Sequence, residues 1–579
     1  MSIIEPKKEF IRLMFCDDGN MKAEWVVHQW RKDFVKVYQS SGEDGLNIRL
    51  IGWKRSSQVS RKDVFFLDIL TEMNHGSITL PEIKDYTFIR AEIGVGKEEV
   101  FFPFFQSNKL KVEGGRRAAG ETEAIWTPIN VIDKEKWQQM SAAYTYYAKS
   151  PYELLKARQL NDGTFQETVT SDVFYSEHQS HNHLLHEEIK YTYHIIMLSW
   201  ECPPAVLGGL GQHVWQLSKQ LAKAGHLVSL VTPHCLGAPE TETVEGVTIY
   251  RAKEVECTYE DFHLFVAQTN MNLVERVRNL SSRNQFSVLH AHDWLVGFAA
   301  RALKGFMALP LVSTIHALEE GRSSLEYSIQ LQTAKWEESL IRNSDALIVC
   351  SSFMKTEVKK KMIGKKEVRV IPNGVHLSKE ESESVSDFLN RKSYTHLALF
   401  LGRMVPEKGI ATLLDATKKI HETHPECLFI LAGKGPYMSD YQSLVCQAGL
   451  EKTMLFVGYL NDREKATILK RCDMLVVPSN YEPFGIVAIE GMAAGKPVIA
   501  ARTGGLSSII KDGETGLLFE PGDAMDLSKK ISSIIENPTL SASFGEKALN
   551  EVKQKYNWED VRDETEAVYE TTVTTSSVQ

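Results

Sequence analysis

Two basic residues stand where a parallel strand is expected to end, in the second half of the chain. Arg403 and Lys408 lie in GRMVPEKG (402–409), directly after the apolar run LALFL. A guanidinium supplies a planar fork of donors and an ammonium a compact point charge, so the two together suit a diphosphate. Taken alone, however, this pair favours the simpler interpretation of solvated loop cations.

The segment PSNYEPFGIVAIEGMAAGKPVIA (478–500) shifts that balance toward a binding site. Glu482 precedes a predicted helix that starts near Gly485, and Glu490 lies about 8 Å along its axis at ~1.5 Å per residue. Backbone N–H groups at the helix start form an anion site, and Gly485 allows a ligand to approach closely. These N–H groups belong to Phe484, Gly485, Ile486 and Val487. One carboxylate can then reach a sugar and the other ribose, although Glu490 alone is equally compatible with a helix-surface carboxylate.

These residues need a scaffold that brings strand ends together, and the pattern of apolar and helical segments from Tyr193 onward predicts one. Apolar runs such as HIIMLSW, LVSLVTP and LVSTIH alternate with helical stretches, and the alternation repeats from HLALFLGR onward. Strands that alternate with helices predict parallel sheets covered on both faces. We therefore expect an α/β protein with two Rossmann-like, doubly wound domains, at 191–375 and 376–579, facing a cleft lined by strand carboxyl ends. The final helix, near Trp558–Thr571, is expected to close back on the first domain.

The first third of the chain differs from the rest. Residues 1–113 contain short aromatic and β-branched runs, among them Phe10–Phe15 and Trp25–Val37, and predict a small β-rich sandwich or barrel. Residues 114–190 are expected to be a linker, helical over 135–160. The aromatic residues Trp25, Trp30, Trp53 and Phe101–Phe105 could form a carbohydrate platform, but core packing is the favoured interpretation.

Composition narrows the class of protein. The 579 residues are 43% hydrophobic and 24% charged, typical of globular chains, with no apolar run of membrane-spanning length. The net charge of 66 − 75 = −9 argues against a general nucleic-acid binder. Eight scattered cysteines without C-x-x-C are typical of a reducing compartment and predict neither disulfides nor a zinc site. We expect a cytoplasmic protein, and peripheral membrane contact and oligomeric state stay open.

The order of the motifs resembles that of a known family. GRMVPEKG, then EPFGIVAIE, then GKPVIAARTGGLSSIIKDGETGLLFEPGD are similar to the retaining glycosyltransferases of the two-Rossmann (GT-B) architecture, within the sucrose synthase-like and glycogen synthase-like group. The likeness spans about residues 191–571. IRAEIGVGKEEVFFPFFQSNKL resembles, less specifically, an uncharacterised domain that accompanies bacterial glycosyltransferases.

The resemblance implies a role for each matching position. Arg403 and Lys408 would bind the donor diphosphate, Glu482 the donor sugar, and Glu490 the ribose. In the first domain, GGLGQHV (208–214) resembles the loop that closes over the donor, HAHDW (290–294) a sugar-facing loop, and STIHALE (313–319) the segment of a sugar-contacting histidine. The implied contact residues of these three segments are Gly208, Gly209, Asp293 and His316. Thr503 and Gly504 would touch the nucleotide, and His316 also fits a hydrogen-bonded histidine at a strand end.

These roles define a reaction and its alternatives. The chain would move a hexosyl unit, glucosyl by preference, with retention from a UDP- or ADP-sugar to a carbohydrate or glycoconjugate hydroxyl. The cations and the helix start would stabilise the leaving diphosphate, so we expect neither a metal nor a cofactor. Val206 replaces the lysine that glycogen synthases carry two residues before the paired glycines, which disfavours glucan elongation. A non-catalytic binding scaffold and a nucleotide-sugar epimerase are the alternatives of another class.

Two other features are discounted as sites. His178, His181, His183 and His186 lie in nine residues, but in a polar stretch that favours a solvated linker over a metal site. Cys202 follows a predicted strand, and without a visible activating base it favours a packing thiol over a nucleophile.

Overall fold

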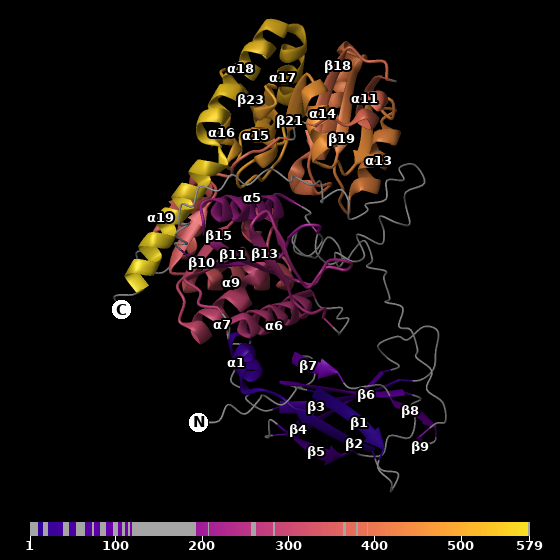
Figure 1. Ribbon diagram of the computed structural model, residues 1–579. Helices are drawn as coiled ribbons and strands as arrows, with labels where there is room; N and C mark the ends of the chain where they lie inside the picture. Colours follow the sequence, from indigo (N-terminus) through magenta and orange to yellow (C-terminus); the bar gives the residue numbers. More distant parts are fainter. Residues whose placement is uncertain are drawn as a thin grey trace.

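The computed structural model shows a β-rich region at the N-terminus, followed by two α/β lobes (Figure 1). It describes residues 10–15, 21–38, 46–53, 64–71, 75–80, 88–95, 102–106, 110–113, 116–117, 193–205, 208–255, 262–281, 284–362, 366–377, 380–390 and 392–576. The predicted helix over 135–160 and the four histidines at 178–186 lie outside the described residues, as does Val206.

The N-terminal region contains two antiparallel sheets. One orders its strands β1-β2-β5, and the other β4-β3-β6-β8-β9, with β7 paired to β6. Alternate side chains of β2 are buried, so one face of this strand contributes to the core, where Trp25 is 2% exposed. The strands are β1 (Phe10–Phe15), β2 (Met21–Val26), β3 (Leu46–Trp53), β4 (Val64–Thr71), β5 (His75–Thr79), β6 (Phe88–Val95), β7 (Phe102–Gln106), β8 (Leu110–Glu113) and β9 (Arg116–Arg117).

The strand-like interpretation of Trp25–Val37 is wrong for most of that run. The chain leaves β2 at Val26 and forms helix α1, Gln29–Tyr38. Trp30 and Phe34 are four residues apart and therefore share one helix face. That face lies against the first α/β lobe, where the buried Arg31 pairs with Glu275 at 2.8 Å (Nη2 to Oε2). The Arg278 guanidinium lies 5.4 Å from the Trp30 ring centroid, so Trp30 serves docking.

The first lobe is built on an eight-stranded sheet in the order β12-β13-β11-β10-β14-β15-β16-β17, parallel except for β12. Ile195 and Met197 of β10 pack toward α5 and α19, whereas Ile196 and Leu198 belong to the core with α6 and α7. The strands are β10 (His194–Leu198), β11 (Leu227–Thr232), β12 (Thr241–Val244), β13 (Val247–Arg251), β14 (Val288–His292), β15 (Leu311–Ile315), β16 (Ala346–Val349) and β17 (Val368–Val370). The helices are α5 (Gly209–Lys223), α6 (Phe262–Ser281), α7 (Gly297–Met307), α8 (Glu319–Arg322), α9 (Ser328–Asn343), α10 (Ser352–Lys361) and the 3-10 turn η4 (Trp294–Val296).

The second lobe has a six-stranded, fully parallel sheet in the order β20-β19-β18-β21-β22-β23. Its strands are β18 (His396–Leu401), β19 (Cys427–Ala432), β20 (Met454–Gly458), β21 (Met474–Val477), β22 (Val498–Ala501) and β23 (Gly516–Phe519). Its helices are α11 (Glu383–Asn390), α12 (Ile410–Thr423), α13 (Met438–Gln447), α14 (Asp462–Arg471), α15 (Ile486–Ala493), α16 (Leu506–Ile509), α17 (Ala524–Glu536), α18 (Pro538–Lys555) and the 3-10 turn η5 (Pro406–Lys408).

The last helix, α19 (Trp558–Ser576), leaves the second lobe and runs along the first (Figure 1). The segment that leaves the first lobe contacts the segment that precedes α19, where the Val375 N–H donates to the Tyr556 carbonyl at 2.9 Å. Farther along α19, the buried Tyr569 hydroxyl is hydrogen-bonded to Nδ1 of His290 at 2.6 Å. The predicted α/β fold of two Rossmann-like lobes after a β-rich region is confirmed. No described helix has both the length and the apolar character needed to span a membrane.

Candidate active site between the two lobes

The carboxyl end of β18 places both predicted diphosphate-binding cations. Arg403 follows the strand, and Lys408 ends the short turn η5 before α12. Gly409 makes this turn possible: its φ is +70°, and a Cβ there would lie 1.8 Å from the Pro478 carbonyl oxygen. Both cations already have acidic neighbours, since Arg403 pairs with Glu407 at 3.2 Å and Lys408 with Glu482 at 2.6 Å. The structure therefore brings Lys408 and Glu482 together from loops 74 residues apart.

Helix α15 begins at Ile486, next to Gly485. Gly485 has a φ of +118°, and a Cβ there would lie 2.7 Å from a Leu506 methyl carbon, so this position requires glycine. The N–H groups of Ile486 and Val487 have no carbonyl partner within the helix because they belong to its first turn. Phe484 precedes the N-cap Gly485 and so lies outside α15; its side chain is 5% exposed, and its ring packs against Tyr556.

Glu490 is buried on α15 and does not lie on the helix surface. Its carboxylate accepts from Lys465 of α14 at 2.6 Å, and Lys465 also lies 3.3 Å from Asp462. Burial alone would lower the pKa of Lys465, but the two carboxylates outweigh it and raise that pKa. Sequence reasoning missed Lys465, because it lies 25 positions before Glu490 and the intervening chain contains a helix end, a strand and a loop.

Thr503 and Gly504 lie against the loop that carries Glu482. The Thr503 hydroxyl donates to the Asn480 carbonyl at 3.1 Å. A Cβ at Gly504 would lie 2.0 Å from the Glu482 carbonyl oxygen, so the two loops approach backbone to backbone. The N–H of Gly505 donates to that same carbonyl at 2.8 Å.

The first lobe contributes the glycine loop at the start of α5. The Gly208 N–H donates to the buried carboxylate of Glu201 at 3.0 Å, which holds the loop at the end of β10. A Cβ at Gly209 would lie 2.8 Å from Ile486 Cδ1, so the loop contacts the first turn of α15. Glu201 was not predicted. Its neighbour Cys202 is buried, and burial raises the pKa of its thiol to about 12, consistent with the favoured packing role.

Asp293 and His316 meet at the carboxyl ends of β14 and β15. The Asp293 carboxylate accepts a hydrogen bond from the backbone N–H of His316 at 2.7 Å. Asp293 adopts a φ of +61°, which is rare for a non-glycine residue. Burial raises the pKa of Asp293 to about 6 against the opposing effect of Arg322. Burial and then Arg322 lower the pKa of His316 to about 3, so its ring is neutral near pH 7.

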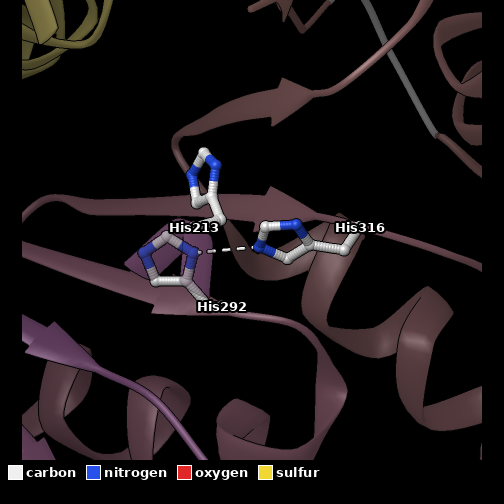
Figure 2. A group of neighbouring side chains, drawn as sticks. All are labelled: His213, His292 and His316. Carbon is white, nitrogen blue, oxygen red and sulfur yellow. Dashed lines mark hydrogen bonds between the residues drawn. The ribbon is translucent and has the colours of Figure 1, made fainter. Parts of the chain in front are cut away.

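His316 belongs to a group of three imidazoles that Figure 2 shows together. We call this group, His213, His292 and His316, the histidine cluster. Nδ1 of His292 lies 3.1 Å from Nε2 of His316, and the ring centroids of His213 and His316 are 4.9 Å apart. Sequence reasoning missed His213 and His292, although both stand inside motifs that it singled out, GGLGQHV and HAHDW.

The two lobes touch directly beside these residues. The Tyr481 hydroxyl of the second lobe accepts the Leu318 N–H of the first at 3.3 Å, and a Cβ at Gly321 would lie 2.1 Å from the Tyr481 ring. The Ser351 hydroxyl donates to the Pro483 carbonyl at 2.6 Å. The loops of His316 and Glu482 thus face one another across a closed interface.

The fold and this arrangement define a class of protein, the two-domain glycosyltransferases, and comparison with known proteins identifies the same class. Residues 207–379 match the family model "Glycosyltransferase Family 4", and residues 382–551 match "Glycosyl transferases group 1". A glycogen synthase of Mycobacterium tuberculosis is 34% identical over 397 residues, which cover 65% of this chain and 94% of the relative. The chain therefore belongs to the GT-B glycosyltransferases of glycogen synthase-like type.

Other relatives agree with this assignment. An uncharacterized glycosyltransferase of Methanocaldococcus jannaschii is 32% identical over 386 residues, covering 65% of this chain and 97% of the relative. Among solved structures, a sucrose-phosphate synthase from Thermosynechococcus elongatus has a TM-score of 0.59 at 26% identity, covering 66% of this chain and 98% of that one. Anabaena HepE has a TM-score of 0.54 at 20% identity over 65% of this chain and 99% of that one, which shows the common fold.

Proposed function

We propose that this protein is a retaining glycosyltransferase that moves a hexosyl unit, glucosyl by preference, from a UDP- or ADP-sugar to a carbohydrate or glycoconjugate hydroxyl. The observation that carries the proposal is the 2.6 Å contact between Lys408 and Glu482, beside Arg403 and the first turn of α15. It joins a cation suited to a departing diphosphate with a carboxylate suited to a sugar. Family membership supports hexosyl transfer, because the relatives include a glycogen synthase and a sucrose-phosphate synthase.

The proposed reaction breaks the bond between the anomeric carbon and a diphosphate oxygen, and forms a bond from the acceptor oxygen to the same face. The acceptor hydroxyl gives its proton to the leaving diphosphate. Arg403, Lys408 and the N–H groups of Ile486 and Val487 stabilise the negative charge that develops there. This set of positive charges and donors supplies leaving-group stabilisation without a metal, so the proposal is metal-independent transfer.

The remaining residues bind the ends of the substrates. Glu482 binds sugar hydroxyls and supports the positive charge at the anomeric centre, and Glu490 binds ribose after exchanging its contact with Lys465. Thr503 and Gly504 lie beside the nucleotide. Gly208 and Gly209 cover the donor, and Asp293 faces the sugar and acceptor side. The neutral ring of His316 serves as a hydrogen-bonding group, which its lowered pKa supports.

Glucan elongation is the second candidate, favoured by the 34% identity to a glycogen synthase. The test is a panel of UDP- and ADP-hexoses with monosaccharide, sugar phosphate, glucan and glycolipid acceptors. Nucleoside diphosphate release is measured, together with the anomeric configuration of the product by proton NMR. Release with a retained configuration supports the proposal, and chain extension of glucan identifies the second candidate. An inverted product would exclude retention, and silence across the panel with nucleotide binding intact would favour a non-catalytic scaffold.

A further inference from the structure

The histidine cluster joins three elements that are distant in sequence. His213 lies on α5, His292 ends β14, and His316 follows β15. One ring nitrogen from each residue lies within 4.8 Å of the others. Figure 2 shows the His213 ring beside the hydrogen-bonded pair of His292 and His316.

The pair already has a spacing that suits a metal. Two ligands about 2.0–2.1 Å from a tetrahedral Zn²⁺ are about 3.3 Å apart, and the His292 and His316 nitrogens are 3.1 Å apart. The third nitrogen must approach by a rotation of its ring, because a separation near 4.8 Å exceeds that spacing. Of the three side chains, His316 is the one that is only partly buried.

His213 provides an independent reason to expect a ligand. Its side chain is 4% exposed, and its Nδ1 is buried with no hydrogen-bond partner among the residues that the structure describes. The side-chain amide of Asn373 faces the same ring and partly opposes the fall of the His213 pKa, but its buried Oδ1 lies outside hydrogen-bonding geometry with every residue that the structure describes. A buried polar atom without a partner costs free energy, which a coordinated ion would recover.

The protonation states also fit coordination. Nε2 of His292 lies 2.9 Å from the Met197 thioether, which only accepts, so Nε2 carries the proton and Nδ1 keeps its lone pair. His316 then donates through Nε2 in the hydrogen bond, and it would move that proton to Nδ1 to coordinate a metal.

We propose that the histidine cluster is an inhibitory site for a borderline transition-metal cation, with Zn²⁺ as the representative ion. Three imidazole nitrogens without carboxylate or thiolate select Zn²⁺ and similar ions over Mg²⁺ or Ca²⁺. Arg322 opposes a cation here, and the adjacent Asp293 carboxylate offsets it. The inhibitory effect rests on the proposed function, because coordination would occupy the His316 nitrogen and tether it to α5, which carries the glycine loop.

The binding test must first remove the metal-binding capacity of the other histidine-rich segment, residues 178–186. Untagged full-length chain carrying His178, His181, His183 and His186→Gln is titrated with Zn²⁺ against a chromogenic chelator, and with Co²⁺ by visible spectroscopy. One tight equivalent per chain and a tetrahedral Co²⁺ spectrum are expected. His213→Gln and His316→Gln, each checked for folding by circular dichroism, should weaken Zn²⁺ binding at least ~100-fold, more than loss of an outer-shell partner. His424→Gln, outside the cluster, is the matched control and should bind normally.

If no Zn²⁺ binds tightly, or if one Zn²⁺ still binds tightly in both cluster variants, the proposed metal site is wrong. In the activity assay, Zn²⁺ should reversibly inhibit the chain that carries the four His→Gln substitutions at 178–186, and a chelator should remove the inhibition. His213→Gln should require at least ~10-fold more Zn²⁺ for the same fractional loss. Tight binding without inhibition would overturn the inhibitory role alone. A chain that binds Zn²⁺ yet transfers no sugar would contradict the proposed function and leave the site standing.

Discussion

At the scale of single residues, the candidate site is a set of charges that already neutralise one another. Lys408 is paired with Glu482, and Lys465 with Glu490. The second pair is well shielded, with side chains 14% and 6% exposed. Under the proposed function, a substrate diphosphate or ribose must compete for groups that hold one another in position, and that arrangement preorganises them.

The Lys465–Glu490 pair makes a stability prediction. Lys465→Met leaves a buried carboxylate without its cation and should lower the free energy of unfolding of the second lobe by about 3 kcal/mol. The double variant Lys465→Met/Glu490→Met should recover most of that loss, because both charges are gone. Urea unfolding of both variants, with the exposed Lys452→Met as control, measures this. Losses that simply add in the double variant would show that the two groups are not coupled.

The sequence predicted the site residues as types, but not their partners. Arg403, Lys408, Glu482 and Glu490 were recognisable because they stand at strand ends or on the following helix. Lys465 was not, because it lies on a helix without a distinctive motif; Glu201 also follows a strand, but nothing in its spacing indicated the Gly208 N–H as its partner. His292 shows the same limit: its apolar strand predicted burial, but nothing in its spacing indicated His316 as its neighbour.

At the scale of elements, α19 couples the two lobes. It starts just after the contact between Tyr556 and Val375. Farther along, its Tyr569 is hydrogen-bonded to His290, which lies on β14, the strand that ends in His292. His290 also bonds to the Thr314 hydroxyl at 2.8 Å through Nε2. Most strands of both lobes followed from apolar runs that alternate with helical stretches, but β12 and β13 were not predicted. The one clear error, α1, arose because an aromatic and β-branched run suggests a strand unless its spacing of four is noticed.

Tyr569→Phe tests this coupling. Loss of the hydroxyl leaves a buried imidazole nitrogen of His290 without its partner, which should cost about 1–3 kcal/mol of stability. Thermal unfolding should show a lower midpoint for Tyr569→Phe than for Tyr394→Phe, whose hydroxyl makes no hydrogen bond among the described residues. An unchanged midpoint would mean that the Tyr569–His290 hydrogen bond does not help to hold α19.

At the scale of the whole molecule, the lobes meet in a closed arrangement that depends on small residues. Tyr481 lies against Gly321, where a side chain would overlap its ring. The β-rich region docks separately through α1 onto the first lobe, through Arg31 and Glu275. Helix α1 contacts α6 and α7, and Figure 1 shows the β-rich region on the side of the first lobe that faces away from the second lobe.

Gly321→Ala should prevent full closure. We expect a larger radius of gyration in small-angle X-ray scattering and a fall in turnover of at least ~10-fold, because small displacements of catalytic groups are costly. Gly305→Ala, where nothing lies within 4 Å of the added methyl, is the control. Gly321→Ala/Tyr481→Ala should restore the scattering profile, since the overlapping ring is gone. A single variant as compact and active as the unaltered chain would contradict the closure account.

The central claim is that Lys408 stabilises a departing diphosphate, and one comparison of turnover tests it most directly. Nucleoside diphosphate release from the best donor is measured for the unaltered chain, Lys408→Ala and Lys418→Ala, the last an exposed lysine on α12 paired with Asp415. Lys408→Ala should lose at least ~10²-fold in turnover with its fold intact, while Lys418→Ala stays near normal. Near-normal turnover in a folded Lys408→Ala variant would contradict the account.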